Sequence, residues 1–531
     1  MLTMKEFLAG TPKVPRPLIA DAYTIGSVHI SREERERSVF HIVPRRGMNQ
    51  WHKFAKDGRL IFTGLTRILR DFFATPVTMD EIEEADKFLK TFHAGGTPYR
   101  WDRAMWERIV NENNGIIPIE IEAFEEGTTA FPYEPVIQIT TATDFGGLAV
   151  WFESKLLQVW SSIERTTTLK WWFEYLKERC RKVHPSWSEA QVEFACSIMC
   201  HDFGDRAGSC AQESEVLGLA HLLVLPGTDT VAGAYQFWKN SGEQPGGCSI
   251  HALAHHTVTG FKNESEAHMT LYQIGKETGI TAHVSDTYNF FQAVDNLVAL
   301  MAFKSTSGYW PTTGNDKNVL VLRPDSGDPA ECVLHILKTC EKYGVFAESD
   351  GLKISTRIRW IQGDSMDWDS MIAILDMCID NGWSPFGSGA FGVGGHLRNS
   401  IARDHTGLSM KLAEVGVNAR PTVKRSETLA KCSIPGEVVV IDNNKDNCAT
   451  VYPAHHRNTN FSAHTLNLLV PYYDGRRATT LAEAFKPAAL VSPAEIKARI
   501  ASDFMRRLSP DQVLSDEIFN QRTALLSGNN W

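Results

Sequence analysis

The chain contains the apolar stretch FACSIMC at residues 194–200, followed directly by HDFGDRAG at residues 201–208. The apolar part is short enough for a buried strand, so we expect the second part to form the loop in which that strand ends. Loops at strand ends commonly carry binding and catalytic side chains. This loop supplies an aromatic ring, Phe203, and a guanidinium, Arg206, together with glycines that let backbone approach a ligand. An ordinary turn at the start of a helix would fit these residues equally well, so the neighbouring sequence has to decide.

The same arrangement recurs along the following part of the chain. An apolar run ends in Gly, Asp, Ser or His, and a helix-like pattern follows. These runs end at Asp202 and Gly204; at Gly227, Thr228 and Asp229; at His255 and His256; at Ser285 and Asp286; at Arg323 to Gly327; and at Gly363 and Asp364. A further run passes into the glycine-rich segment 386–395. Strands that alternate with helices predict parallel strands in a barrel or an open sheet. Loops beyond the carboxyl ends of such strands meet at one site, so we expect their polar residues to line a common pocket.

The flanking parts of the chain have a different pattern. Residues 79–92 space their apolar side chains as an amphipathic helix does, and residues 116–123 and 135–141 look like strands. After Lys411 the alternation of strands and helices decays. We therefore expect an α/β protein, with an irregular barrel-like domain of parallel strands and an accompanying α+β domain built from the N- and C-terminal parts. The expected divisions are an N-terminal α+β domain at 1–150, the barrel-like domain at 151–411, and a C-terminal segment at 412–531 that packs back on the N-terminal domain.

Composition excludes several classes of protein. With 43% hydrophobic and 22% charged residues, the chain has the make-up of a globular protein. A net charge of -9 argues against a nucleic-acid partner. The longest apolar runs, such as 217–225, are too short for a membrane helix, and Pro15 and Pro17 interrupt any signal peptide. The 10 cysteines show no paired framework, so we expect a reducing, cytoplasmic setting.

The loops that follow the predicted strands offer three kinds of chemistry. Glycines in segment 386–395 could cradle a phosphate with backbone N–H groups, although the pattern matches neither the Walker nor the dinucleotide fingerprint. Carboxylates can hold ribose hydroxyls or Mg²⁺, and His255 can act as a base or covalent acceptor. Cations suited to a polyphosphate are Arg206, Arg323, Arg403, Lys411 and Lys424. Taken singly, each residue fits a helix cap or a solvated surface; the placement after successive strands favours a shared site.

Several of these segments resemble, in the same order, motifs of the nicotinamide phosphoribosyltransferase family, a type II phosphoribosyltransferase family. They are HDFGDR at 201–206, GTDTVAG at 227–233, SD at 285–286, RPDSG at 323–327, IQGD at 361–364 and RD at 403–404. The resemblance covers roughly residues 18–430. It implies transfer of phosphoribosyl from phosphoribosyl pyrophosphate (PRPP) to nicotinamide, giving nicotinamide mononucleotide and pyrophosphate for NAD salvage. It also implies Mg²⁺, ATP as a co-substrate, and a homodimer with active sites at its interface.

The resemblance also implies a role for each matching residue. Phe203 would stack on one face of the pyridine and Tyr23 of the partner subunit on the other, and Asp229 would accept a hydrogen bond from the carboxamide. The ribose and its 5'-phosphate would be held by Arg323, Asp325, Gly363, Asp364, Gly394 and Gly395. Pyrophosphate and phosphate would be held by Arg206, His201, Arg403, Ser409, Lys411 and Lys424, with Arg45 or Arg46 from the partner. The catalytic group would be His255, Asp286 and Asp325, with His255 as the histidine that ATP phosphorylates.

Asp229 bears on the choice of the base, and Ala254 bears on the coupling of the reaction to ATP. A carboxylate at Asp229 favours a neutral amide and repels nicotinate, so we expect nicotinamide as the base. Ala254 stands before His255 where the family has Glu, so a carboxylate that could orient the imidazole is missing, and His256 is an alternative phosphate acceptor.

Three other functions compete with this interpretation. The nearest is a nicotinate phosphoribosyltransferase, which shares the fold and the reaction. The second is a metal-dependent barrel hydrolase built on His201, His251, His255 and Asp325, which lack paired ligand spacing. The third is an inactive relative that serves as a binding or regulatory protein.

Overall fold

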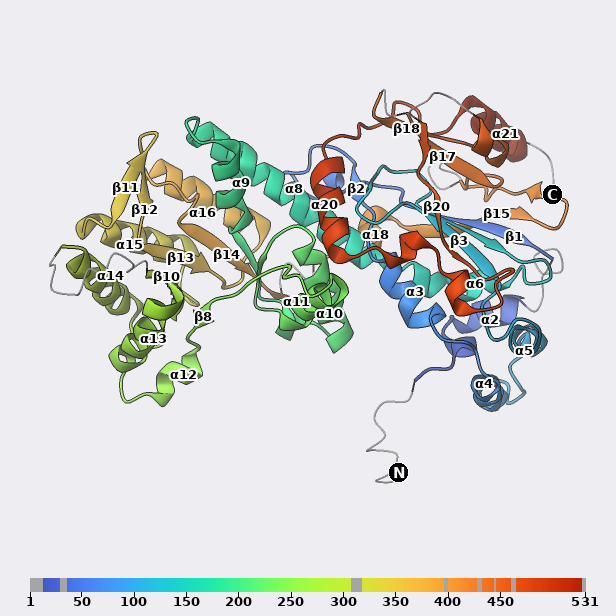
Figure 1. Cartoon of the computed structure of the whole chain (residues 1–531), viewed down its shortest axis with the longest axis horizontal. Coiled ribbons are helices and arrows are strands. Elements are labelled where there is room, and N and C mark those ends of the chain that lie inside the picture. Colours follow the sequence, from blue (N-terminus) through green and yellow to red (C-terminus); the bar gives the residue numbers. More distant parts are fainter. Residues whose placement is uncertain are drawn as a thin grey trace. The chain divides into compact units, whose positions relative to one another are not determined.

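The structure, a computed structural model, describes residues 13–28, 36–306, 318–395, 400–426, 432–443, 446–459 and 465–527. The chain forms two compact units (Figure 1). Unit 1 comprises residues 1–167 and 402–531, and unit 2 comprises residues 168–401. The division expected from the sequence, with boundaries at residues 150 and 411, stays a prediction. Among the described residues, no helix combines the length and the apolar character that crossing a bilayer requires.

Unit 2 is built on a seven-stranded sheet with the order β7-β6-β14-β13-β10-β9-β8. The strands are β6 Cys200–Asp202, β7 Gly227–Thr228, β8 His251–Ala252, β9 Ile280–Val284, β10 Val319–Arg323, β13 Ile358–Gln362 and β14 Gly389–Val393. Every neighbouring pair runs parallel. The predicted parallel-strand domain is therefore confirmed.

The two edges of this sheet are joined by one short segment. Cys248 forms a parallel bridge with Gly227 of the edge strand β7, and β8, only a few residues later, pairs with β9. The segment 248–252 thus contacts both ends of the strand order, and the sheet curls into an irregular, barrel-like form. A core cluster of Ala282, Val321 and Ile361 comes from β9, β10 and β13.

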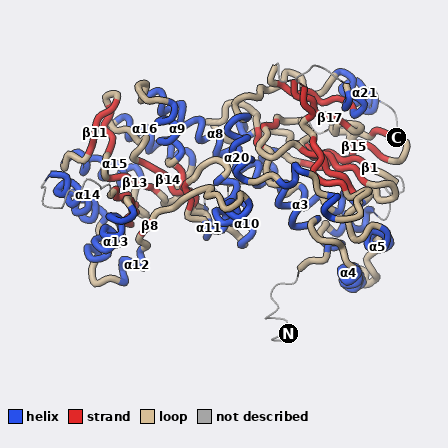
Figure 2. Tube along the Cα trace, in the orientation of Figure 1, coloured by secondary structure: helices blue, strands red, loops and turns tan. Residues whose placement is uncertain are grey.

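Helices surround the strands of unit 2 (Figure 2). They are α9 Glu189–Ser197, α10 Ala211–Leu222, α11 Val231–Asn240, α12 His255–Gly260, α13 Glu264–Thr278, α14 Phe290–Thr306, α15 Pro329–Lys342 and α16 Trp368–Asp380. A short hairpin is formed by β11 Phe346–Ser349 and β12 Leu352–Ser355.

The strand expected at residues 194–200 is wrong for most of its length. Ser188 and Gln191 form a capping box that begins α9, and this helix continues to Ser197. Val192, Ala195 and Cys196 are buried and lie three to four residues apart, which is helical spacing. The strand itself is only Cys200–Asp202. An apolar run of this length does not distinguish a buried strand from a buried helical face.

Unit 1 contains a six-stranded antiparallel sheet with the order β16-β15-β1-β5-β3-β20. Its strands are β1 Ser38–Val43, β3 Ile119–Ala123, β5 Ile137–Thr141, β15 Ser409–Val415, β16 Arg420–Pro421 and β20 Val470–Asp474. β1 pairs with β15, and β3 pairs with β20, so strands from the two ends of the chain share one sheet. The expected α+β domain made from the N- and C-terminal parts is confirmed.

The remaining elements of unit 1 cover or extend this sheet. Smaller sheets are formed by β2 Leu60–Ile61 with β4 Thr129–Ala130, and by β17 Val438–Asn443, β18 Cys448–Pro453 and β19 Thr465–Asn467. The helices are α2 Ala22–Val28, α3 Leu65–Phe73, α4 Met79–Phe92, α5 Arg103–Glu112, α6 Leu148–Trp151, α7 Glu153–Leu156, α18 Arg403–Thr406, α19 Leu481–Ala484, α20 Pro493–Asp503 and α21 Asp516–Ser527. α4 has the bounds predicted from the sequence, and a capping box of Thr78 and Glu81 begins it. α8 Val159–Val183 runs from unit 1 into unit 2.

Candidate active site

Phe203 follows the carboxyl end of β6, and two neighbouring strand ends make room for its ring. A Cβ atom on Gly392 would come 2.2 Å from the ring, and one on Gly363 would come 3.3 Å from it. Any larger residue at position 392 would therefore displace the ring. The Arg323 guanidinium carbon lies 5.7 Å from the ring centroid, which is a cation–π distance. The structure thus brings Phe203, predicted to hold the base, together with Arg323 and Gly363, predicted to hold the ribose, from the ends of β6, β10 and β13.

The three residues predicted to be catalytic also lie together. His255 Nε2 is 3.3 Å from Asp325 Oδ2 and 3.8 Å from Asp286 Oδ1. On the other side of the ring, His255 Nδ1 is 3.0 Å from the Thr287 hydroxyl. Because both imidazole nitrogens face polar groups, the ring orientation is set by its neighbours. Arg323 donates from Nη2 to Asp325 Oδ2 at 2.9 Å, which links this cluster to Phe203.

Asp286 is the least exposed member of this cluster. Its side chain is 5% exposed, and its Oδ2 accepts a hydrogen bond of 2.5 Å from the Ser326 hydroxyl. Its Oδ1 is buried and has no hydrogen-bond partner among the described residues. A buried carboxylate oxygen in that state needs a proton donor or a cation to offset its desolvation. Oxygen ligands of this kind fit Mg²⁺, which proteins usually hold through one or two carboxylates and the substrate's phosphates.

Asp229 directly follows β7, and His201 lies within the paired strand β6. The Asp229 backbone N–H donates to the Asp202 carbonyl at 2.9 Å, and the exposed Asp229 carboxylate accepts a hydrogen bond from the Ser249 hydroxyl. Burial lowers the pKa of His201, and the Asp229 carboxylate opposes that shift. Burial therefore favours the neutral form of the His201 ring. The expected contact of His201 with phosphate stays a prediction. In that contact the neutral imidazole would donate a hydrogen bond to the phosphate.

The glycine-rich loop after β14 lies beside the loop that follows β6. A Cβ on Gly394 would come 3.5 Å from the Phe203 carbonyl oxygen, and one on Gly395 would come 3.4 Å from the Ala207 side chain. Ala207 belongs to the 3-10 turn η4 Asp205–Ala207, which also carries the exposed Arg206. Asp364, at the end of β13, accepts a hydrogen bond of 3.1 Å from Ser365. The residues expected at the 5'-phosphate and at the leaving group thus come from adjacent loops.

The other predicted cations form a group within unit 1. The backbone N–H groups of Arg45 and Arg46 donate to the Thr406 carbonyl, and Arg45 Nε donates to the Gly407 carbonyl at 2.8 Å. Ser409 follows directly and pairs with Val43 of β1. This geometry holds the start of β15 and the short helix α18 against the arginine pair.

Lys411 is a half-buried cation of this group. Burial lowers its pKa, and the positive charges of Lys424, Arg45 and Arg403 lower it further. Arg45, Ser409 and Lys411 also line one small cavity, which places two of these cations beside each other. From the resemblance, Arg45 or Arg46 would come from the partner, while Arg403 and Lys411 would not. The structure joins them within one chain, so a partner that supplies Arg45 would supply Arg403 and Lys411 as well.

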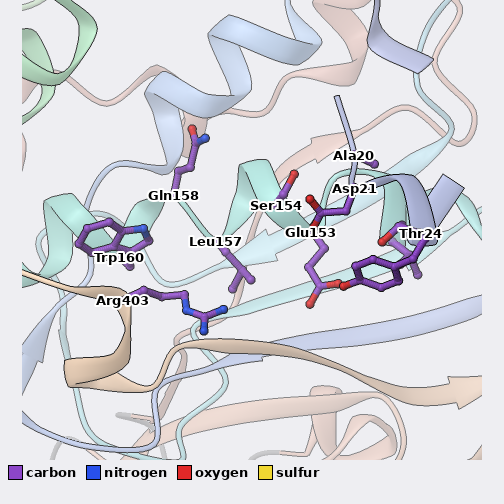
Figure 3. Close-up of a pocket in the computed structure, with 11 residues that line it drawn as sticks. Ala20, Asp21, Thr24, Glu153, Ser154, Leu157, Gln158, Trp160 and Arg403 are labelled. Atoms are coloured by element: carbon purple, nitrogen blue, oxygen red, sulfur yellow. The ribbon is translucent and has the colours of Figure 1, made fainter. Parts of the chain in front are cut away.

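A cavity of about 220 Å³ in unit 1 is lined by Arg403 of this group and by Tyr23, another of the predicted residues (Figure 3). It is lined by Ala20, Asp21, Tyr23, Thr24, Val150, Glu153, Ser154, Leu157, Gln158, Trp160 and Arg403. The Tyr23 ring is 71% exposed, so a ring-shaped ligand could stack on it. Burial raises the pKa of Glu153, and the charges of Lys411 and Arg403 oppose that shift. Glu153 is thus a counter-charge to the cation group.

Sequence reasoning missed Glu164, which holds α18 in place. Its Oε2 accepts a hydrogen bond of 3.1 Å from the Ala402 backbone N–H, and its Oε1 is bonded to His405 Nδ1. Burial raises the pKa of Glu164 to about 8, and burial lowers the pKa of His405. Burial thus favours the neutral form of both groups. Glu164 lies among Ser, Arg and Thr residues at 161–168, so no local pattern in the sequence marks it.

Comparisons with known proteins agree with this geometry. Residues 198–444 match the nicotinate phosphoribosyltransferase (NAPRTase) family, and residues 17–121 match the N-terminal domain of nicotinamide phosphoribosyltransferase. A nicotinamide phosphoribosyltransferase from Xanthomonas campestris pv. campestris is 30% identical over 368 residues, which is 67% of this chain and 74% of that protein.

Two solved structures share the fold at low sequence identity. Human nicotinic acid phosphoribosyltransferase has a TM-score of 0.58 and 16% identity. The match covers 96% of this chain and 100% of the human chain. Nicotinate-nucleotide pyrophosphorylase from Pyrococcus furiosus has a TM-score of 0.54 and 16% identity, with 95% and 97% of the two chains covered. The motifs, the parallel-strand unit, the family matches and the bacterial relative lead to one conclusion: this chain belongs to the nicotinate and nicotinamide phosphoribosyltransferase family, a family of pentosyltransferases in NAD biosynthesis.

Proposed function

We propose that the protein transfers phosphoribosyl from PRPP to nicotinamide, giving nicotinamide mononucleotide and pyrophosphate in NAD salvage. The observation that carries this proposal is the position of Arg323, whose guanidinium lies over the Phe203 ring and also donates to Asp325. One cation therefore connects the aromatic platform for a flat base with the carboxylates that suit a ribose.

The reaction places two demands on the site, and both can be assigned to residues of this chain. Breaking the bond between ribose C1 and pyrophosphate develops positive charge on the sugar and negative charge on the leaving group. Carboxylates such as Asp325 stabilise the sugar, and cations such as Arg206 and Lys411 stabilise the pyrophosphate. Stacking on Phe203 holds the pyridine nitrogen toward C1, which replaces a bimolecular encounter by a positioned attack. Mg²⁺, held by Asp286 and the substrate phosphates, would neutralise part of the leaving-group charge.

Asp229 is the residue that we propose selects the base. Its carboxylate is exposed and can accept a hydrogen bond from the N–H groups of a carboxamide, whereas it repels the charge of nicotinate. The match to a family named for nicotinate supports nicotinate phosphoribosyltransferase as the alternative function.

The two functions differ in an assay with both bases. With PRPP and Mg²⁺, kcat/KM for nicotinamide is expected to exceed that for nicotinate by roughly 100-fold, because the unfavourable carboxylate pair is buried in only one complex. In the matched variant Asp229→Asn, the charge is lost but the shape is kept, so the preference should shrink toward unity. Product formation is followed by mass detection of the two mononucleotides. A wild-type enzyme that prefers nicotinate would refute nicotinamide as the substrate.

We also propose that the protein works as a homodimer with interfacial sites, in which unit 2 of one subunit uses the Tyr23 and Lys411 groups of the other. A mixing experiment tests this. Phe203→Ala and Lys411→Ala are each expected to be nearly inactive alone. After mixing and subunit exchange, activity should return to roughly a quarter of wild type, because half of the dimers become mixed and half of their sites are intact.

The control for mixing uses two variants of the same unit. Phe203→Ala mixed with Arg323→Ala leaves every site with a defect, so activity should stay at the level of the single variants. No recovery in the first mixture despite confirmed exchange would argue for sites made by single subunits. Recovery in this control would mean that Phe203 and Arg323 do not serve one site from the same subunit.

A further inference from the structure

Two adjacent histidines and a glutamate face one another in the C-terminal part of unit 1. His455 and His456 lie in the 3-10 helix η6 Ala454–Asn458, directly after β18, and Glu517 lies in the first turn of α21. His455 Nε2 is 3.5 Å from Glu517 Oε1, and His456 Nε2 is 3.0 Å from Glu517 Oε2. Each imidazole therefore points at a different oxygen of the same carboxylate.

The spacing of these atoms fits a tetrahedral ion. The ligand atoms of the three side chains lie within 4.8 Å of one another, and no other group of this kind occurs among the described residues. Bonds of about 2.0–2.1 Å from Zn²⁺ to nitrogen and oxygen give tetrahedral ligand separations of roughly 3.3 Å. The observed 3.0 Å and 3.5 Å bracket that value. Small shifts of exposed side chains would complete the geometry.

Hydrogen bonding explains only part of this arrangement. His456 is at an ordinary hydrogen-bond distance from the carboxylate, whereas His455 is at the outer limit. The two imidazole centroids are 4.2 Å apart, so both rings lie close enough to approach one ion. Two neutral imidazoles and one carboxylate form the nitrogen and oxygen donor set that zinc and related transition metals prefer.

An ion could reach this site from solvent. The side chains of His455 and Glu517 are 64% and 51% exposed, and that of His456 is 24% exposed. His455 also lines a cavity of about 390 Å³, together with Gln521, which lies one turn beyond Glu517 on α21. The cavity provides space for a water molecule or a small anion as a fourth ligand. An entry path is one of the features that a metal site requires.

We propose that His455, His456 and Glu517 bind one Zn²⁺ or a similar divalent transition metal, which ties α21 to η6. The site belongs to unit 1 and shares no residue with the proposed active site. It holds the folded arrangement of α21, so metal binding raises the stability of the folded chain by mass action. Mg²⁺ should not substitute, because it prefers oxygen ligands.

The test uses full-length protein without a histidine tag, first stripped of metal with a chelator. Titration with Zn²⁺ followed by calorimetry should give one tight site per chain, and Co²⁺ should give the d–d absorption of a tetrahedral ion. Saturating Zn²⁺ should raise Tm by several degrees, and Mg²⁺ should leave it unchanged. His455→Ala and Glu517→Gln should each weaken binding at least about ten-fold. The exposed histidine variant His93→Ala is the matched control and should bind as wild type does.

Phosphoribosyl transfer without Zn²⁺ reports whether each variant is folded, since none of these residues belongs to the catalytic machinery. The proposal is overturned if wild type binds no Zn²⁺, or if His455→Ala and Glu517→Gln bind it as tightly as wild type while remaining active.

Discussion

Arg323→Ala is expected to lower kcat/KM for phosphoribosyl transfer by about a thousand-fold, the loss typical of removing one preorganised charge-stabilising donor. Arg323 lies over Phe203 and donates to Asp325, so its removal affects both the base platform and the ribose end. It also leaves the Asp325 carboxylate beside His255 without its ion-pair partner. Steady-state rates with nicotinamide and PRPP measure the effect.

Two control variants separate this role from a general effect of charge. Arg323→Lys keeps the charge but lacks the planar fork of donors, so we expect only a small recovery. Arg67→Ala removes an arginine that pairs with Asp71 along α3 and should leave activity unchanged. If Arg323→Ala retained more than a tenth of wild-type kcat/KM, Arg323 would not connect base and ribose as proposed.

His255→Ala is expected to abolish ATP turnover while slow phosphoribosyl transfer continues. In the proposed coupling, an imidazole nitrogen of His255 attacks the γ-phosphorus of ATP, the bond to the β-γ bridging oxygen breaks, and ADP leaves. Thr287 and Asp325 contact the two ring nitrogens and so hold the imidazole. Ala254, which stands where the family has Glu, has no carboxylate that could do this. Transfer does not require this step, so a basal rate should remain.

The measurement is phosphate transfer from labelled ATP to the protein. Wild type should carry a phosphate that is labile in acid and stable in base, and His255→Ala should carry none. His256→Ala is the matched control, because His256 is exposed and is the neighbouring alternative acceptor. Labelling that disappears in His256→Ala and persists in His255→Ala would transfer the role to His256.

Local patterns in the sequence were sufficient to predict many of the strands of unit 2 and the loops that follow them. Apolar runs followed by Asp, Ser, His and Gly marked the carboxyl ends of β9, β10 and β13, and the parallel sheet then placed Asp286, Asp325 and Gly363 at one end. The carboxyl ends of parallel strands lie at the same end of a sheet whatever the side chains are. The order of the loops in the sequence was therefore enough to predict that these residues meet. The pattern failed at residues 194–200, where a short apolar run fitted a helix and a strand equally well.

The sequence by itself determined the alternation of strands and helices, the amphipathic helix Met79–Phe92, and the motifs that the family shares, because each depends on residues close together in the chain. Only the tertiary structure decided that β15 and β20 pair with β1 and β3, that Arg45 joins Lys411, and that His455 and His456 face Glu517. Those pairs are separated by tens to hundreds of residues. Their meeting depends on which buried surfaces pack together, and no local periodicity encodes that choice.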